Sequence, residues 1–243
     1  MPTETEGQAR KLCIDLGIGL GGASAAFRDA GWDVVGVDLN PKFRPTILAS
    51  YTHLPFRTNL NPLVMIAAPD CSCFSMASVY HHWKDKKPVS ERAKKAIADT
   101  LALKDEIMRV SPDYAPLENP HPGMMCHVLG QPPHKIRQSD YGSKFKKPTG
   151  IWEFGRKRLN WKWLEFQGNW IKAPRGSRTG IQGKGPRTSL GQRHGAFMGV
   201  HKKELLKEHH GQSGFTLHTT DANARAYWPY GLSQAILEAV SQP

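Results

Sequence analysis

Residues 12–22 read Leu-Cys-Ile-Asp-Leu-Gly-Ile-Gly-Leu-Gly-Gly. The five residues before the glycines predict a short buried strand, and the glycines predict a tight turn into a helix over residues 23–30. Gly31 ends that helix, and residues 32–37 predict a second strand that closes on Asp38. This succession is the usual start of a doubly wound sheet. The sequence therefore predicts an α/β fold of the Rossmann-like type with a mostly parallel sheet.

The glycines have the spacing of a turn that holds a nucleoside cofactor, because Gly17, Gly19 and Gly22 fit G-x-G-x-x-G. Asp38 is placed to accept hydrogen bonds from ribose hydroxyls. Asp15 favours S-adenosylmethionine, since an acid can balance its sulfonium and amino group but would repel a pyrophosphate. NAD and FAD also fit the glycine pattern, so a nicotinamide-dependent oxidoreductase stays open as an alternative.

Two further strand ends carry reactive side chains. An apolar run over residues 63–68 stops at Pro69, and Cys71 follows directly. Ligands collect at the carboxyl ends of the strands in an open parallel sheet, so Cys71 is expected to face a cleft. A thiolate there is a candidate nucleophile, and a buried structural cysteine is the alternative from this stretch alone. Residues 112–120 predict another short strand, which ends in Glu-Asn-Pro.

Three motifs, in this order, resemble those of the DNA cytosine-5 methyltransferase family in its compact phage or prokaryotic type. The family's first motif has the form D-L-F-x-G-x-G-G, and residues 15–22 match it with Gly17 in the place of the aromatic residue. Residues 69–75, Pro-Asp-Cys-Ser-Cys-Phe-Ser, are similar to the nucleophile motif P-P-C-Q-x-F-S and depart from it at the second and fourth positions. Residues 118–120 reproduce the motif E-N-P.

The resemblance implies methyl transfer from S-adenosylmethionine to C5 of cytosine in DNA, through a covalent adduct with a flipped base. Cys71 would attack C6, and Glu118 would hydrogen-bond or protonate N3, with Asn119 beside it. Lys147 takes the place of the first arginine in the family motif Y-G-x-P-Q-x-R-x-R and would donate to the cytosine O2. Asp70 would raise the pKa of the thiol if it faced the sulfur.

The cofactor-binding residues that the resemblance implies follow the first, second and central strands. They are Asp15, Leu16, Gly17, Gly19, Gly21, Gly22, Asp38, Leu39 and Pro69. In the Y-G motif, Phe145 and Thr149 occupy the places of the glutamine and the second arginine. No metal site is predicted, because Cys71 and Cys73 lack the two-residue gap of a zinc knuckle.

The net charge of +12 is distributed unevenly. Residues 134–203 hold 17 Lys or Arg against three acids, whereas the rest of the chain is nearly balanced. This favours a polyanionic partner, with phosphate contacts expected from the basic segment, including residues 156–158. We expect duplex DNA. Basic charge does not distinguish DNA from RNA, so methylation of RNA stays open, as does a catalytically impaired nucleic-acid binder that keeps the fold.

Three parts of the chain are expected. Residues 1–150 would form the catalytic core, residues 151–215 a short basic target-recognition region, and residues 216–243 a C-terminal segment that ends in a helix and packs back on the core. Within the core, residues 90–110 predict an amphipathic helix, and residues 76–89 a loop that in the family closes over the flipped base. The apolar face of the helix would consist of Ala93, Ile97, Leu101 and Met108.

Several classes of protein are disfavoured. The chain has no apolar stretch of about 18 residues or more, so no transmembrane helix is predicted. Its first residues are polar and acidic, unlike a signal peptide. Four cysteines in 243 residues do not resemble a disulfide framework. We therefore expect a cytoplasmic protein without membrane contact, and a monomer.

Overall fold

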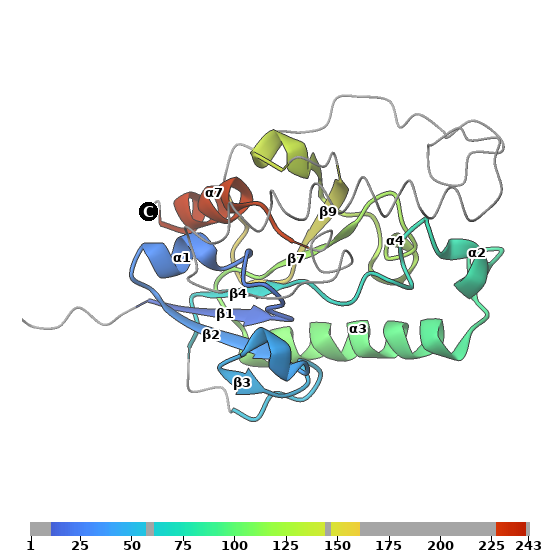
Figure 1. Cartoon of the computed structure of the whole chain (residues 1–243), viewed down its shortest axis with the longest axis horizontal. Coiled ribbons are helices and arrows are strands. Elements are labelled where there is room, and N and C mark those ends of the chain that lie inside the picture. The colour runs from blue at the N-terminus through green and yellow to red at the C-terminus, as the bar shows by residue number, and fades with distance from the viewer. Residues whose placement is uncertain (1–10, 57–60, 144–146, 161–226, 242–243) are drawn as a thin grey trace, which may run out of the picture.

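The structure is a computed structural model, and it describes residues 11–56, 61–143, 147–160 and 227–241. Its centre is a seven-stranded sheet in the order β3-β2-β1-β4-β7-β9-β8 (Figure 1). The strands are β1 (Leu12–Leu16), β2 (Asp33–Asp38), β3 (Ile47–Leu48), β4 (Val64–Ala67), β7 (Pro116–Pro120), β8 (His134–Arg137) and β9 (Pro148–Glu153). Residues 161–226 lie outside the described residues, and they include most of the predicted target-recognition region, so the division into three parts stays a prediction.

Five neighbouring strands, β3, β2, β1, β4 and β7, run parallel. Only β9 runs against its neighbours β7 and β8. The predicted Rossmann-like α/β fold with a mostly parallel sheet is confirmed. After β1 the chain moves outward through β2 and β3, and it returns to β4 on the other side of β1. This reversal opens a crevice at the carboxyl ends of β1 and β4, which is where doubly wound sheets bind ligands.

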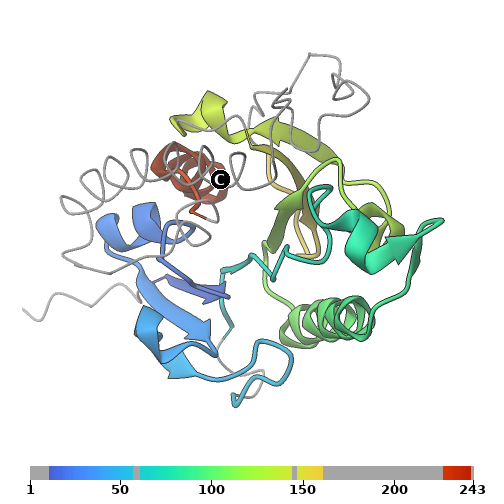
Figure 2. The same ribbon diagram turned by 45° about the vertical axis from the view of Figure 1, so that its right-hand side comes forward.

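Helices cover both faces of the sheet. They are α1 (Ala25–Asp29), α2 (Val79–His82), α3 (Glu91–Val110), α4 (Cys126–Leu129) and α7 (Tyr230–Ser241), with short 3-10 turns η1 (Pro41–Phe43) and η3 (Gln138–Tyr141). Figure 2 shows α1 and α7 side by side on one side of the sheet and α3 on the other. No helix in the described ranges is long and apolar enough to cross a membrane.

The alternation of side chains along β4 builds the two cores. Val64 and Ile66 face the core beneath α1 and α7, whereas Met65 and Ala67 face the core beneath α3. All four are fully buried. A strand buried on both faces must be apolar at every position, which is why this run shows no polar alternation in the sequence.

The C-terminal helix α7 packs on the first β-α-β unit. The Ser233 hydroxyl donates to the carbonyl of Ala23 at 2.7 Å and accepts from the amide of Ala26 at 3.1 Å. The Tyr230 hydroxyl donates to the carboxylate of Asp29 at 2.9 Å. These contacts bring the residues just before α7 next to the glycine-rich turn, although more than 200 residues separate them in the sequence.

The predicted helix over residues 90–110 is confirmed as α3, with Ser90 accepting from the amide of Ala93 at 3.1 Å as its N-cap. The predicted apolar face is wrong in its second half, because Leu101 is 41% and Met108 57% exposed. Steps of four residues advance 400° around a helix, so a row spaced by four drifts off one stripe. The buried stripe mixes steps of three and four and consists of Ala93, Thr100, Leu103, Ile107 and Val110.

The segment expected as a loop, residues 76–89, contains regular structure. It holds α2 and a hairpin of β5 (Trp83–Lys84) and β6 (Lys87–Pro88). The two turn residues, Asp85 and Lys86, have φ of 48° and 64°, as a tight two-residue hairpin turn requires. The indole of Trp83 is buried and donates to the carbonyl of Cys73 at 2.7 Å. The hairpin is therefore anchored next to the Cys71 segment.

Candidate active site

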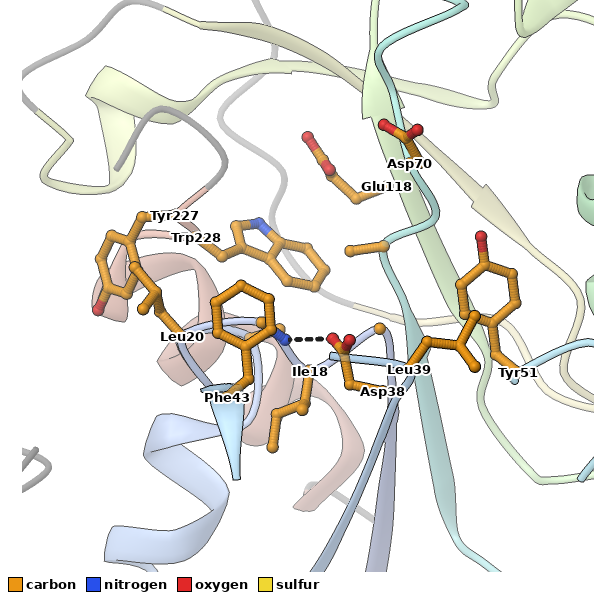
Figure 3. Close-up of a pocket in the computed structure, with 15 residues that line it drawn as sticks. Ile18, Leu20, Asp38, Leu39, Phe43, Tyr51, Asp70, Glu118, Tyr227 and Trp228 are labelled. Atoms are coloured by element: carbon orange, nitrogen blue, oxygen red, sulfur yellow. Dashed lines mark hydrogen bonds between the residues drawn. The ribbon is translucent and has the colours of Figure 1, made fainter. Parts of the chain in front are cut away.

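A cavity of about 370 Å³ lies at the crevice between β1 and β4. The glycine-rich turn after β1 forms one wall, and the end of β2, with Asp38, forms another. Asp70 after β4, Glu118 on β7 and Trp228 before α7 complete the lining (Figure 3). Pockets of this size suit ligands as large as a nucleoside cofactor.

The glycine-rich turn is held close to the sheet by its backbone. The amides of Gly17 and Ile18 donate to the carbonyl of Val37 at 2.9 and 3.1 Å. Gly17 has φ of 78°, and a Cβ there would lie 3.0 Å from the carbonyl oxygen of Ala68. Gly22 has no room for a Cβ either, because the backbone of Trp228 lies against it. The glycines are thus required by left-handed backbone at one end and close packing at the other.

Asp38 lies at the cavity wall, as expected for a ribose-binding acid. Its Oδ2 accepts from the amide of Gly19 at 3.1 Å, and its Oδ1 accepts from the amide of Asn40 at 2.8 Å. Each carboxylate oxygen can accept more than one hydrogen bond, so both can still accept from ligand hydroxyls. Gly17, Gly19, Gly22 and Leu39 also line this cavity, as expected.

Asp15 is not brought to the cavity. Its side chain is fully buried behind the turn, where Oδ2 accepts from the hydroxyl of Ser24 at 2.6 Å. Burial raises the pKa of Asp15 to about 6, although the Ser24 hydrogen bond and the charge of Arg28 oppose that rise. Leu16, Gly21 and Pro69 are likewise absent from the cavity lining among the described residues.

Of the two neighbouring sulfurs, only Cys71 has exposed surface. Its carbonyl accepts from the amides of Phe74 and Ser75, both at 3.0 Å, in a turn that follows Pro69. Cys71 is partly buried, whereas Cys73 is fully buried in the core with Phe74 and Trp83. The turn therefore leaves Cys71 partly exposed and buries Cys73 in the core.

Glu118 is the centre of a buried polar cluster. Its Oε1 accepts from Nε2 of Gln138 at 3.2 Å and from the hydroxyl of Thr149 at 3.3 Å. Nζ of Lys147 lies 3.3 Å from the same oxygen. The side chains of Glu118 and Lys147 are 8% and 17% exposed. Burial of a charge is costly unless it is paired, and these three donors supply the pairing.

The neighbouring amide, Asn119, connects this cluster to the segment that carries Cys71. Its Nδ2 donates to the carbonyl of Pro69 at 3.3 Å, and the side chain is fully buried. Strands β4 and β7 are paired only at Ala67 and Leu117, so beyond that point the two chains separate. Asn119 bridges the gap and fixes the distance between the two catalytic candidates.

The charges around Cys71 oppose one another. Burial raises the pKa of the Cys71 thiol to about 11, with the Glu118 carboxylate adding to the rise and Lys147 lowering the pKa. Asp70 also raises it, but less than Glu118 does. The Asp70 carboxylate is engaged elsewhere, since it accepts from the amide and hydroxyl of Ser72 at 2.9 and 2.8 Å and pairs with Arg92 at 3.6 Å. Lys147 is the cation that favours the thiolate.

Several contributors were not found from the sequence, among them Phe43 and Tyr51 at the cavity and the two residues Gln138 and Trp228. Gln138 reaches Glu118 only because β8 pairs with β9 and sets η3 beside β7. Trp228 reaches the cavity only because α7 packs on α1. Neither residue lies in a recognisable motif. Phe145, which was placed in the motif after Gly142, lies outside the described residues.

The basic residues 156–158 lie at the other edge of the sheet. The amide of Arg156 donates to the carbonyl of Pro112 at 3.0 Å, just before β7 begins. Their side chains pair with acids: Arg156 and Lys157 with Asp113, and Arg158 with Glu153. The cavity and Cys71 lie at the opposite, carboxyl edge. The expectation that residues 156–158 contact phosphate stays a prediction, and it concerns the edge of the sheet opposite Cys71.

No protein-family model matches this chain, and no curated protein matches it. Solved structures do. The Entamoeba histolytica methyltransferase EhMeth is 12% identical over 67% of this chain, with a TM-score of 0.46. A predicted DNA modification methyltransferase encoded within an E. coli prophage is 16% identical over 59%, with a TM-score of 0.41. A variant of DNMT2 from Spodoptera frugiperda is 15% identical over 65%, with a TM-score of 0.38. The matched part spans 58%, 46% and 54% of those chains, respectively, or about half of each.

Proposed function

We propose that the protein transfers a methyl group from S-adenosylmethionine to C5 of cytosine in DNA. The observation that carries the proposal is the meeting of Cys71, Glu118 and Lys147 at the carboxyl edge of the sheet, directly beside the cavity of the glycine-rich turn. An acid and a cation close enough to influence the charge state of a thiol are expected in a reactive site rather than in a structural cluster.

The cavity has the chemistry to hold S-adenosylmethionine. Asp38 offers two carboxylate oxygens for ribose hydroxyls, and the glycine-rich turn lets a ligand approach the backbone closely. Leu39 and Tyr51 supply apolar surface for an adenine ring. When bound there, the sulfonium would supply an electrophilic methyl group.

The chain's own residues activate the acceptor. C5 of cytosine is a weak nucleophile, so Sγ of Cys71 forms a bond to C6 while Glu118 donates a hydrogen bond or a proton to N3. The electron density moves to C5, which takes up the methyl group. Loss of the C5 proton to a base then restores the C5–C6 double bond and breaks the bond between C6 and Sγ. N3 gives back to Glu118 any proton that it received, and the thiolate leaves. The thiolate then takes a proton from water, which replaces the one that the thiol lost to water before it attacked C6, and the enzyme returns to its starting state.

The polar cluster around Glu118 has a defined part in this scheme. Gln138 and Thr149 fix one carboxyl oxygen, which leaves the other oriented for N3 of a bound base. Lys147 stabilises negative charge both on Glu118 and on the departing thiolate. Thr149 takes the place of the second arginine of the family motif, and in that place its hydroxyl donates a hydrogen bond to Glu118.

At the carboxyl edge of the sheet, the lysines of the β5–β6 hairpin are the groups that would contact phosphate. Lys84, Lys86 and Lys87 are exposed, and none of them forms an ion pair within the part of the chain that the structure describes. The hairpin is anchored to the Cys71 segment through Trp83. Unpaired lysines next to the nucleophile suit the backbone of a polynucleotide whose base has to reach Cys71.

The proposal is tested by covalent trapping. Duplex DNA that contains 5-fluorocytosine cannot release the group at C5 as a proton, so with S-adenosylmethionine present it should form a denaturant-resistant adduct. Cys71→Ser should abolish both the adduct and methylation of ordinary DNA. The matched control, Cys73→Ser, should keep substantial activity because Cys73 is buried away from the cleft. An adduct that survives loss of Cys71 but not of Cys73 would contradict the assignment.

The same assay with tRNA that contains 5-fluorocytosine distinguishes DNA from RNA as the substrate. An adduct that forms with RNA and not with DNA would show that the protein methylates RNA.

One observation favours a second candidate, a nucleic-acid binder with impaired catalysis: a thiol with a pKa of about 11 is almost entirely protonated at neutral pH. For that candidate, DNA binds to the protein but no adduct forms with either polymer.

A further inference from the structure

Trp228 lines the cavity and carries a polar group without a partner among the described residues. Its side chain is 4% exposed, and its Nε1 is buried without a hydrogen-bond partner in the described structure. A buried indole N–H ordinarily finds an acceptor, and leaving it unpaired is costly. Trp228 also lines the cavity of the glycine-rich turn. In Figure 3 its ring lies between Glu118 on one side and Phe43 and Asp38 on the other.

The position of Trp228 along the turn indicates which part of a ligand it meets. Asp38 is bonded to Gly19, near the middle of the turn, whereas the backbone of Trp228 packs against Gly22 at the far end. A nucleoside with its ribose at Asp38 and its adenine at Leu39 and Tyr51 would extend its 5′ substituent along the turn toward Trp228. For S-adenosylmethionine, that substituent carries the amino-acid group.

We propose that the indole N–H of Trp228 donates a hydrogen bond to the carboxylate of the cofactor's amino-acid group. The inference rests on the proposed function, because it takes S-adenosylmethionine as the ligand. The carboxylate is the strongest acceptor at that end of the molecule and would satisfy the N–H that the protein leaves without a partner. Trp228 then raises the affinity for nucleosides that carry an amino-acid group over the affinity for nucleosides that lack one.

The experiment compares two ligands that share the nucleoside. S-adenosylhomocysteine has the amino-acid group, and 5′-methylthioadenosine lacks it. Trp228→Phe keeps an aromatic ring and removes the N–H, so calorimetric titration should show binding of S-adenosylhomocysteine weakened by about 10- to 100-fold. Binding of 5′-methylthioadenosine should change by less than about threefold.

Trp152→Phe is the matched control. The Trp152 indole is also buried, but it donates to the carbonyl of Gly130 at 2.9 Å, away from the cavity lining. Its replacement should lower stability and leave the affinities for both ligands unchanged. A second measurement uses the unaltered protein: the ¹⁵N–¹H signal of the Trp228 indole, assigned from Trp228→Phe, should shift strongly with S-adenosylhomocysteine and weakly with 5′-methylthioadenosine.

The outcomes separate this inference from the function on which it rests. Equal weakening of both ligands by Trp228→Phe, or no weakening of either, would overturn the role of the indole while the cofactor assignment stands. If the unaltered protein binds neither S-adenosylmethionine nor S-adenosylhomocysteine, the inference and the proposed function are both overturned.

Discussion

Strands β7 and β9 carry an acid with basic partners at each end of their pairing. At the carboxyl edge of the parallel sheet, Glu118 meets Lys147, and the two side chains are 8% and 17% exposed. At the amino edge, Asp113 meets Arg156 and Lys157, whose side chains are 62% and 59% exposed. The residue types are nearly the same, and the basic partners at both ends come from the basic segment of the sequence.

The two ends differ in what the charges can influence. Lys157 donates to Asp113 at 2.9 Å and holds the pKa of that carboxyl below its usual value. Neither of these groups is among those that shift the pKa of Cys71. Exposed pairs of this kind are screened by water and salt. At the other end, burial makes the charges of Glu118 and Lys147 felt by the Cys71 thiol. Burial and position in the sheet, rather than composition, therefore separate a surface ion pair from a candidate catalytic cluster.

The largest expected effect comes from replacing the two acids in turn. Glu118→Gln should slow methyl transfer by about 100- to 10,000-fold, because general acid help is lost. The same change removes a charge that raises the pKa of Cys71, so alkylation of Cys71 by iodoacetamide at pH 8 should become faster. Slower methyl transfer together with faster alkylation of Cys71 would distinguish a chemical role of Glu118 from damage to the fold.

Asp113→Asn is the control at the other end of the strands and should leave both rates unchanged. Equal losses of methyl transfer from the two substitutions would mean that position in the sheet does not decide the chemistry.

The next largest effect concerns the two lysines. With a pKa of about 11, Cys71 should be alkylated about tenfold faster for each unit of pH between about 7 and 10, since only the thiolate reacts. Lys147 lowers that pKa, so Lys147→Met should raise it and move the profile to higher pH. The rate at pH 8 should then fall roughly tenfold for each pH unit by which the pKa of the thiol rises. Peptide mass spectrometry identifies the modified cysteine.

Lys157→Met removes a lysine at the amino edge and should leave the profile in place. A profile that stays in place with Lys147→Met would show that this cation does not influence the thiol.

The last prediction compares two clusters of basic residues, one in the β5–β6 hairpin and one at residues 156–158. Their replacement should affect the rate of methyl transfer least and the affinity for DNA most. Replacing Lys84, Lys86 and Lys87 by Ala should make the salt dependence of DNA affinity less steep, by up to about 0.9 in log–log slope for each phosphate that the protein no longer neutralises. The same replacement at Arg156, Lys157 and Arg158 should change the slope little, because those side chains are already paired with acids at the other edge. The reverse result would place the DNA surface at the amino edge.

Much of the fold follows from local sequence. The strand β1, the glycine-rich turn and α1 were predicted closely, because an apolar run, glycines with required backbone conformations and a short helical pattern act over a few residues. The N-terminus of α3 was predicted for the same reason, since Ser90 caps it locally. The apolar face of α3 was not, because its burial depends on which stripe the sheet covers.

The candidate site divides in the same way. The sequence by itself determined that Cys71 and Glu118 follow or end buried strands, and that glycines and Asp38 form a turn suited to a nucleoside. Only the tertiary structure decided that Asp15 is buried behind the turn, that Cys71 rather than Cys73 has exposed surface, and that residues 156–158 lie at the far edge. It also brought Gln138 and Trp228 to the site. Local conformation depends on neighbours in the chain, whereas burial and charge coupling depend on distances across the sheet, which no local pattern encodes.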